Sequence, residues 1–284
     1  MSTATVIIPT YCEAANIAEM VERLSNTCPG VDILVVDDDS PDGTAQLASE
    51  HGCRVLKRTT CRGLSSAVME GVKLSNGTVL VIDGDLQHPP ELAGKMLKAL
   101  DTYDLVIASR NVPGGGVEGW SKMRILVSAV ANILAAPFVP RIKDRTTGCF
   151  AFHTCILDGV TINATGFKIA LEVMSRGHYK SFVEVPYIFV PRVAGTSKLS
   201  SRQITEYLKQ LMTLPILRQP NLTIVKGLKF LVAGSGGAVI TFAVTYGLTE
   251  FGHLWYMFSV VTGTVFGALW NFVVNALWTF RRQV

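Results

Sequence analysis

Short apolar runs rich in Val, Ile and Leu alternate with longer amphipathic stretches over roughly the first 110 residues. The runs are continuously apolar, which is typical of parallel strands that are covered on both faces. The stretches between them repeat apolar residues at helical spacing. This alternation predicts an α/β domain with a mostly parallel sheet. The expected strands are 6–8, 33–36, 55–56, 79–82 and 105–108, and the expected helices are 15–25, 44–51, 65–75 and 90–100.

Four polar clusters stand immediately after expected strands, at 9–13, 37–40, 83–85 and 109–110. Open α/β sheets bind their ligands at the carboxyl ends of the strands. Those ends share one edge of a parallel sheet, so we expect the four clusters to meet in a single cleft.

The segment from Thr78 to Glu91 contains the most informative of these clusters. Its apolar strand runs directly into Asp83 and Asp85, and Gly84 between them lets the backbone approach a ligand. Hard divalent cations such as Mg²⁺ or Mn²⁺ bind one or two carboxylates and complete their shell with substrate phosphates. An isolated Asp-x-Asp is more often a solvated turn. The strand before it and the two prolines after it make a metal site an equal alternative.

A different pattern begins at Trp120. From there to Ile142 the residues are apolar on most helical faces, and Pro137 and Pro140 interrupt the segment. A core helix is one interpretation. A helix lying in a membrane interface, over about 120–140, is preferred because the segment is too interrupted to span a bilayer. A second interface helix is expected from Arg202 to Leu217.

Two long uncharged stretches follow, at about 230–249 and 254–280. Each is long enough to cross a hydrocarbon core of about 30 Å, and together they predict a helical hairpin. Lys226 and Lys229 precede the first stretch, and Arg281 and Arg282 follow the second. The positive-inside rule therefore predicts that both ends, and the α/β domain, are cytosolic. Glycines in both stretches would permit close packing within the hairpin or in a homo-oligomer.

Composition supports a membrane protein. The chain has 284 residues, 49% of them hydrophobic, and its mean hydropathy is +0.34. The net charge of +4 is spread along the chain without the basic, aromatic-rich patches of nucleic-acid binders, so phosphate ligands and anionic lipids are the expected partners. The six cysteines show no zinc-ligand spacing, and no cleavable signal peptide is expected at the N-terminus.

Eight motifs occur in order between about residues 4 and 212. They are PTYCEAANI, VVDDDSPDGTA, GLSSAV, DGDLQHPPE, the element from Trp120 to Arg124, DRTTGCFAF, GFKIALE and VPYIFVPRVAGTSKL. This set resembles the polyprenyl-phosphate glycosyltransferases of glycosyltransferase family 2, and among them the dolichol-phosphate mannosyltransferases. The stretch NFVVNALWTF at 271–280 is similar to the first half of a GtrA-like four-helix anchor. The two-helix form expected here would depart from both four-helix and single-helix anchors.

The resemblance implies three regions. A GT-A nucleotide-sugar transferase domain would cover 1–200, an interface helix and linker 201–225, and a transmembrane hairpin 226–284. The implied reaction is inverting transfer of mannose from GDP-mannose to dolichyl phosphate, giving dolichyl β-D-mannosyl phosphate for protein glycosylation. The implied location is the endoplasmic reticulum membrane in a eukaryote or the plasma membrane in a prokaryote.

The resemblance also implies roles for individual residues. Asp83, Asp85 and Gln87 would bind Mg²⁺ or Mn²⁺, with Gly84 beside them. Arg110, Lys168, Arg192 and Lys198 would surround the diphosphate and the acceptor phosphate, and Arg124 would lie near the lipid phosphate. The base and ribose pocket would be formed by Pro9, Tyr11, Glu13, Val36 and Asp38. Two local alternatives remain: Glu13 as a helix N-terminal charge, and Asp37 to Asp39 as caps of the next turn.

The implied chemistry needs no strong general base, because the acceptor phosphate is already ionised. His88 and His153 are accordingly expected to be structural, and the turn-rich segment 190–198 is expected to be a closing loop. One alternative is a polyprenyl-phosphate glucosyltransferase that uses UDP-glucose, or a bacterial undecaprenyl-phosphate relative. Another is a non-catalytic GtrA-like protein that translocates or scaffolds lipid-linked sugars. A nicotinamide-binding domain is disfavoured because the first turn lacks G-x-G-x-x-G.

Overall fold

The structure is a computed structural model that describes residues 4–75, 77–162, 168–191, 201–214 and 222–275. The chain divides into two compact units, Met1–Leu217 and Arg218–Val284. Arg192 and Lys198 lie outside the described residues, as does most of the expected closing loop.

In the described part of the first unit, seven strands form one sheet in the order β3-β2-β1-β4-β7-β5-β8. All neighbours are parallel except β7, which is antiparallel to both β4 and β5. The mostly parallel sheet predicted from the sequence is thereby confirmed. The strands are β1 (Thr5–Thr10), β2 (Asp32–Asp37), β3 (Arg54–Lys57), β4 (Thr78–Val81), β5 (Leu105–Ser109), β7 (Phe150–His153) and β8 (Phe182–Pro186).

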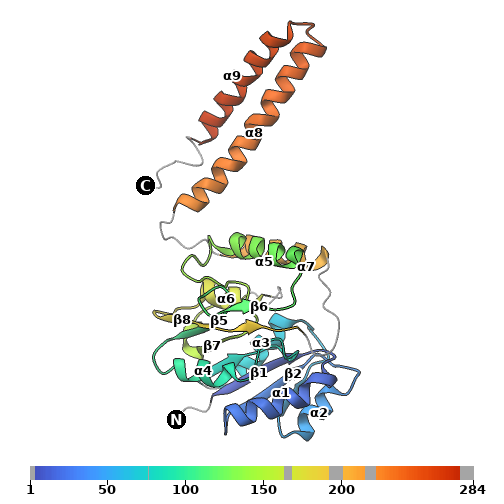
Figure 1. Cartoon of the computed structure of the whole chain (residues 1–284), viewed down its shortest axis with the longest axis vertical. Coiled ribbons are helices and arrows are strands. Elements are labelled where there is room, and N and C mark those ends of the chain that lie inside the picture. Colours follow the sequence, from blue (N-terminus) through green and yellow to red (C-terminus); the bar gives the residue numbers. More distant parts are fainter. Residues whose placement is uncertain (1–3, 76, 163–167, 192–200, 215–221, 276–284) are drawn as a thin grey trace. The chain divides into compact units, whose positions relative to one another are not determined.

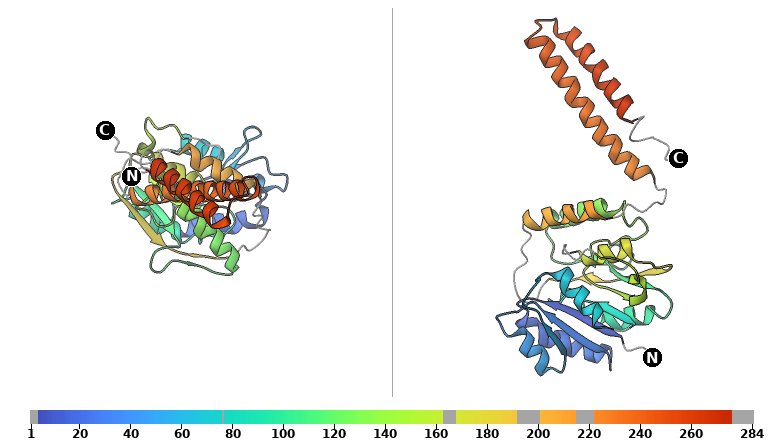
Figure 2. Two further views of the ribbon diagram at one scale, coloured as in Figure 1. Left: turned by 90° about the horizontal axis from the view of Figure 1, so that it is seen from above. Right: turned by 180° about the vertical axis from the view of Figure 1, so that it is seen from behind.

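Helices cover both faces of this sheet, and alternate strand residues supply two separate cores (Figures 1 and 2). On one face Ile7, Val81 and Phe150 pack with helices α3 and α6. On the other face Ile8 and Leu80 pack with helices α1 and α4. Burial on both faces explains why the strands read as continuous apolar runs. The helices that cover the sheet or follow its strands are α1 (Ala14–Thr27), α2 (Thr44–Glu50), α3 (Leu64–Lys73), α4 (Leu92–Ala99) and α6 (Ile169–Arg176). A 3₁₀ turn lies at Thr154–Leu157.

Two further helices, α5 (Lys122–Ala135) and α7 (Ser201–Thr213), lie side by side as a layer at one end of this unit (Figure 1). The Tyr207 hydroxyl of α7 donates to the Ala131 carbonyl of α5 at 2.7 Å. Helix α5 ends at Ala135, earlier than the predicted segment, because Pro137 has no backbone N–H with which to continue the helical hydrogen bonds.

The α5–α7 layer presents apolar side chains to its surroundings. Only Ala135 is buried among the residues of α5, which argues against the core-helix interpretation. The exposed apolar residues of the layer are Met123, Ile125, Leu126, Val130, Ile133, Ile204 and Leu208. Beside the main sheet, two short parallel strands, β6 (Gly116–Val117) and β9 (Ile188–Phe189), fix the chain before α5.

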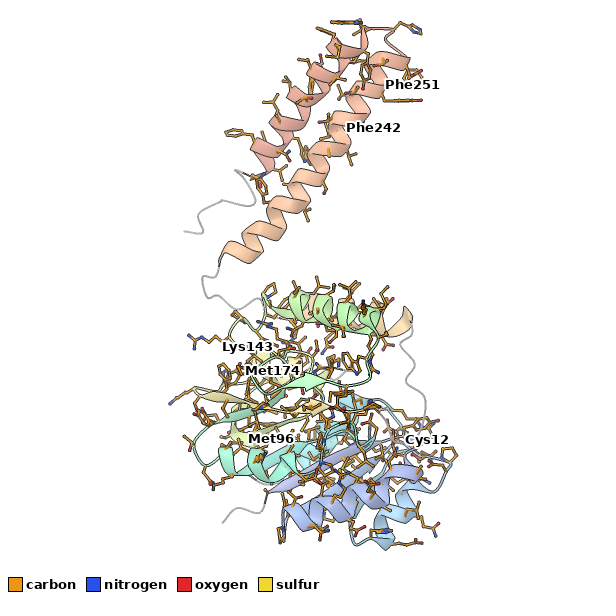
Figure 3. The ribbon with its side chains drawn as sticks, viewed as in Figure 1. Cys12, Met96, Lys143, Met174, Phe242 and Phe251 are labelled. Atoms are coloured by element: carbon orange, nitrogen blue, oxygen red, sulfur yellow. The ribbon has the colours of Figure 1, made fainter. Side chains whose placement is uncertain are left out.

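The second unit is a hairpin of α8 (Leu222–Glu250) and α9 (Tyr256–Val274). Within them, Val232–Glu250 and Tyr256–Val274 are each long and apolar enough to cross a membrane. Phe242 and Phe251 project outward, with 73% and 80% of their surface exposed (Figure 3). Helix contact is close at Gly267, where an added Cβ would lie 2.6 Å from the Gly237 carbonyl oxygen. The predicted hairpin is confirmed, although its expected continuation to residue 280 passes beyond the described residues.

Candidate active site

A cavity of about 490 Å³ opens at the carboxyl ends of β1, β2 and β4. Helix α3 begins on one side of it and helix α6 on the other. Three of the four polar clusters expected to meet at this edge of the sheet, 9–13, 37–40 and 83–85, contribute to the lining, and 109–110 does not. Its lining combines carboxylates, a lysine and backbone turns: Pro9, Thr10, Tyr11, Glu13, Asp38, Leu64, Ala67, Val68, Val81, Asp83, Gly84, Asp85, Thr147, Gly148, Lys168, Ile169 and Ala170.

The Asp83–Gly84–Asp85 turn forms the floor of this cavity. Its geometry is tight: the Gln87 amide donates to Oδ1 of Asp85 at 3.1 Å, and Leu86 has a positive φ of 60°. At Gly84 an added Cβ would lie 3.2 Å from the Thr10 side chain, so the turn packs closely against β1. Gln87 is buried outside the lining, and its side-chain amide donates to the Val190 carbonyl at 3.4 Å.

The donor set of this turn fits a hard divalent cation. Asp83 and Asp85 offer two carboxylates at the cavity, the number that Mg²⁺ usually takes from a protein when substrate phosphates supply further oxygens. Within the described ranges, no group of three or more His, Cys, Asp or Glu side chains could hold a metal by itself.

The aspartates after β2 divide into three distinct environments. Asp37 is fully buried and accepts from the Ser40 amide at 2.8 Å, so it caps the turn. Asp39 is paired at the surface with Lys57 and Arg62. Asp38 alone lines the cavity. Val36, the other predicted base-site residue of this strand, is fully buried in the core and is absent from the lining.

Asp38 is held by a residue that sequence reasoning missed. Arg58 is 4% exposed, and its Nη1 lies 2.6 Å from Oδ1 of Asp38. The Gly63 amide donates to the other carboxylate oxygen at 2.7 Å. Arg58 also donates to Ser66 at 2.8 Å. Arg58 lies twenty residues after Asp38 in the sequence, outside the motif that contains the aspartate. The motif alone therefore could not identify Arg58 as its partner.

The entrance beside α1 is formed by Tyr11 and Glu13. Tyr11 is 56% exposed, so its ring is available to stack on a planar ligand. Glu13 accepts from the Asn16 side chain at 2.7 Å, close to the start of α1. This contact agrees with the helix-terminus alternative, and the same carboxylate also lines the cavity.

Lys168 brings a positive charge to the opposite wall. Its ammonium donates to the Thr146 carbonyl at 2.8 Å. Burial and then the charge of Arg110 lower the pKa of Lys168 to about 8, while Asp83 and Asp144 act in the opposite direction. The group is therefore largely charged near neutral pH.

Arg110 lies behind this wall, in a buried ion pair. Its Nε and Nη2 donate to the two oxygens of Asp144, each at 2.8 Å, and Nη2 also donates to Thr146 at 2.9 Å. Burial would raise the pKa of Asp144, but hydrogen bonds and charge from Arg110 lower it. The Arg110 and Arg124 guanidinium carbons lie 5.5 and 4.3 Å from the ring centre of Trp120. The same indole therefore makes cation–π contacts with two arginines that are predicted to bind phosphate. Neither arginine is among the cavity-lining residues.

The two histidines that were expected to be structural, His88 and His153, differ in their hydrogen bonding. His153 is held by the Leu100 carbonyl at 2.9 Å and by Thr78 at 3.3 Å, which ties β7 to its neighbours. His88 is 2% exposed, and neither ring nitrogen has a hydrogen-bond partner among the described residues. Burial, followed by the charges of Arg110 and Lys168, lowers the pKa of His88 to about 3.

Comparison with known proteins agrees with this arrangement. Residues 5–158 match the model for glycosyl transferase family 2, and residues 229–284 match the GtrA/DPMS transmembrane domain. The dolichol-phosphate mannosyltransferase of Pyrococcus furiosus is 38% identical over 288 residues, which is 98% of this chain and 81% of that protein. The chain belongs to glycosyltransferase family 2. It is a glycosyltransferase and a membrane protein.

Other relatives of this glycosyltransferase bear similar names. The dolichol-phosphate mannosyltransferase of Saccharomyces cerevisiae is 35% identical, covering 75% of this chain and 87% of that one. The polyprenol monophosphomannose synthase of Mycolicibacterium smegmatis is 37% identical, covering 71% and 82%. A solved glucosyl-3-phosphoglycerate synthase from Mycobacterium tuberculosis, in complex with Mn²⁺ and UDP, has a TM-score of 0.55 at 19% identity and covers 75% of this chain and 81% of that one. That likeness confirms the GT-A-like fold.

Proposed function

We propose that this glycosyltransferase transfers mannose from GDP-mannose to dolichyl phosphate, with inversion, and so supplies dolichyl β-D-mannosyl phosphate for protein glycosylation. The observation that carries the proposal is the cavity in which the Asp83 and Asp85 carboxylates face the Lys168 side of the site. Relatives named as dolichol-phosphate and polyprenol mannosyltransferases support the sugar and the lipid class.

In this proposal the nucleoside end of the donor binds between Tyr11, Glu13 and Asp38, with Pro9 and the backbone near Val36 completing the pocket. Asp38 is suited to accept hydrogen bonds from the base or ribose, because Arg58 and the Gly63 amide hold its carboxylate in one orientation. Glu13 offers a second acceptor at the same end.

We propose that Asp83 and Asp85, with Gln87 nearby, bind Mg²⁺ or Mn²⁺ at the diphosphate. A cation in this position would neutralise charge on the departing GDP. Lys168 would add a charge-assisted contact to the same phosphates. Arg110 has a remaining nitrogen, Nη1, beyond those bonded to Asp144 and Thr146, and with Arg124, Arg192 and Lys198 it would face the acceptor phosphate.

The reaction would be a single displacement. An oxygen of the ionised acceptor phosphate forms a bond to the anomeric carbon, while the bond from that carbon to the GDP oxygen breaks. No proton needs to be removed from the nucleophile, so positioning and electrostatic stabilisation would supply the catalysis. The low pKa and deep burial of His88 agree with a mechanism without a histidine base.

We also propose that the α5–α7 layer rests in the membrane interface, through the exposed apolar residues named above. The catalytic unit would then be cytosolic, at the endoplasmic reticulum in a eukaryote or the plasma membrane in a prokaryote. The glycine-rich hairpin would support a homo-oligomer. Native mass spectrometry from micelles that detects single chains alone would overturn that last point.

A donor panel tests the function. The full-length protein is assayed with dolichyl phosphate, Mg²⁺ or Mn²⁺, and either GDP-mannose or UDP-glucose. We expect transfer from GDP-mannose alone, with an Asp85→Ala variant reduced by roughly 10²-fold or more, as for the loss of one transition-state contact. Transfer from UDP-glucose alone would overturn the choice of donor. Full activity of Asp85→Ala would contradict the role proposed for Asp85, and a wild-type protein that transfers from neither donor would favour the non-catalytic alternative.

A further inference from the structure

His88 is a buried polar group without a visible role. Its ring stacks on Tyr187, with ring centres 5.1 Å apart, and meets Phe189 edge-on at 5.4 Å. Both aromatic residues belong to the β8–β9 segment, and together they leave 2% of His88 exposed. Burying a polar atom without a hydrogen bond is unfavourable, so the unpaired ring of His88 calls for an explanation.

The ring points toward the cavity floor. His88 Nδ1 lies 3.6 Å from Oδ2 of Asp83, slightly beyond hydrogen-bonding distance. An ionised carboxylate can only accept, so a nitrogen that approaches it must carry the proton. A neutral histidine has one N–H, and placing it on Nδ1 would give that nitrogen an acceptor after a small rotation of Asp83.

The surroundings limit where Asp83 can go. On one side the Asp83 carboxylate packs tightly against Gly148. A Cβ added at Gly148 would overlap Oδ2 of Asp83 and lie 3.0 Å from its Cγ. On the other side the aromatic pair holds the histidine ring in place. The Asp83 side chain is 31% exposed, and its open side is the cavity. A hydrogen bond from His88 would therefore select one orientation of the carboxylate.

We propose that His88 is a positioning residue, which donates its Nδ1–H to Asp83 and thereby fixes this carboxylate for a divalent cation on a nucleoside diphosphate. The inference rests on the proposed function. Carboxylates that bind metals are themselves usually hydrogen-bonded, and loss of such a partner typically costs 10–100-fold in metal affinity. His88 does not line the cavity, so it acts through Asp83 and not on the substrate.

Three variants of the full-length protein separate the two ring nitrogens. His88→Asn places an amide N–H near the Nδ1 position, His88→Gln places one near Nε2, and His88→Phe retains the ring without a donor. Mn²⁺ binding is followed by electron paramagnetic resonance, with Mn²⁺ alone and with Mn²⁺ plus GDP. Thermal unfolding midpoints are recorded for each protein.

We expect His88→Phe and His88→Gln to lose roughly 10–100-fold in Mn²⁺ affinity, and His88→Asn to stay within about threefold of wild type. His153→Phe is the control, because it removes a histidine whose bonds to Leu100 and Thr78 lie away from the aspartates. It should lower the unfolding midpoint and leave Mn²⁺ affinity unchanged.

Wild-type affinity in His88→Phe would overturn the inference, as would equal affinities of the Asn and Gln variants. Should the Phe variant fail to fold, the Asn–Gln comparison still decides, since both bury an amide. The assay needs no sugar donor. Wild-type protein that binds Mn²⁺ but transfers no mannose would contradict the proposed function alone, and wild-type protein that binds no Mn²⁺ would contradict both.

Discussion

Chemically identical side chains lie in different environments in this protein. Asp37, Asp38 and Asp39 are consecutive, yet one caps a turn, one lines the cavity and one pairs with surface cations. Only Asp38 is fixed by a buried arginine. The capping alternative was therefore correct for Asp37, while Asp38 lines the cavity and remains a predicted ligand-binding residue. Strand direction alone could not assign these roles, because they depend on Arg58 and on the loop before α3.

Lys168 gives a prediction about pH at the residue scale. With a pKa of about 8, its ammonium is charged below that pH and neutral above it. We expect log kcat/KM for the sugar nucleotide, which reports ionisation of the free enzyme, to fall as pH rises through about 8. Measurement across about pH 6.5–9.5 spans the range from the charged to the neutral form. Bound diphosphate favours the charged lysine, so the fall in kcat should come at higher pH.

Lys168→Arg is the matched variant for this profile. A guanidinium remains charged throughout the range, so the descending limb should disappear even where the maximum rate is lower. A limb that persists unchanged in the arginine variant would assign the ionisation to another group.

At the scale of elements, α5 and α7 expose apolar residues that a helix of a soluble domain would bury. Tyr207 joins the two helices, and Gln210 of α7 donates to the Lys168 carbonyl at 3.0 Å. The layer is thus attached directly to the start of α6, where the cavity lysine lies. The sequence indicated two interface helices from their apolar faces, but not their pairing, which depends on contacts between residues about 76 positions apart.

Leu126→Glu tests the membrane role of this layer. Leu126 is 56% exposed on α5. Losing half the burial of a leucine costs about 1 kcal/mol, which corresponds to roughly a fivefold change in an equilibrium. We expect transfer to long-chain dolichyl phosphate in liposomes to fall by about that factor or more, while transfer to a short, water-soluble prenyl phosphate is unchanged.

Leu74→Glu is the control for this comparison, since Leu74 is 46% exposed at the end of α3, outside the layer. It should leave both activities unchanged. Equal loss in the two variants, or equal loss with the two acceptors, would remove the case for an interfacial layer.

At the scale of the whole molecule, a complete α/β unit is joined to a separate apolar hairpin. All described cavity-lining residues belong to the first unit, so the hairpin contributes none of the described chemistry. The hairpin exposes aromatic and aliphatic side chains along its length, as a structure surrounded by lipid should.

Thiol labelling tests the topology. Cys61 and Cys155 are exposed on the first unit, and Leu254, in the turn between α8 and α9, is 41% exposed. With a membrane-impermeant maleimide on intact prokaryotic cells, where the protein would lie in the plasma membrane, we expect no labelling of the wild-type protein and labelling of Leu254→Cys. Permeabilisation should expose the native cysteines in both proteins. Labelling of wild-type protein before permeabilisation would place the catalytic unit outside.

The sequence by itself determined the elements of the first 110 residues and the hairpin, because apolar periodicity is local. It predicted the first five strands, the helices between them and the hairpin, and it brought Asp83, Asp85, Glu13 and Asp38 to one sheet edge. Tertiary structure alone decided the antiparallel insertion of β7 between β4 and β5. It also decided three side-chain contacts: the ion pairs of Arg110 with Asp144 and of Arg58 with Asp38, and the proximity of His88 to Asp83. These depend on burial and on which distant side chains meet, and neither property is encoded in a local pattern.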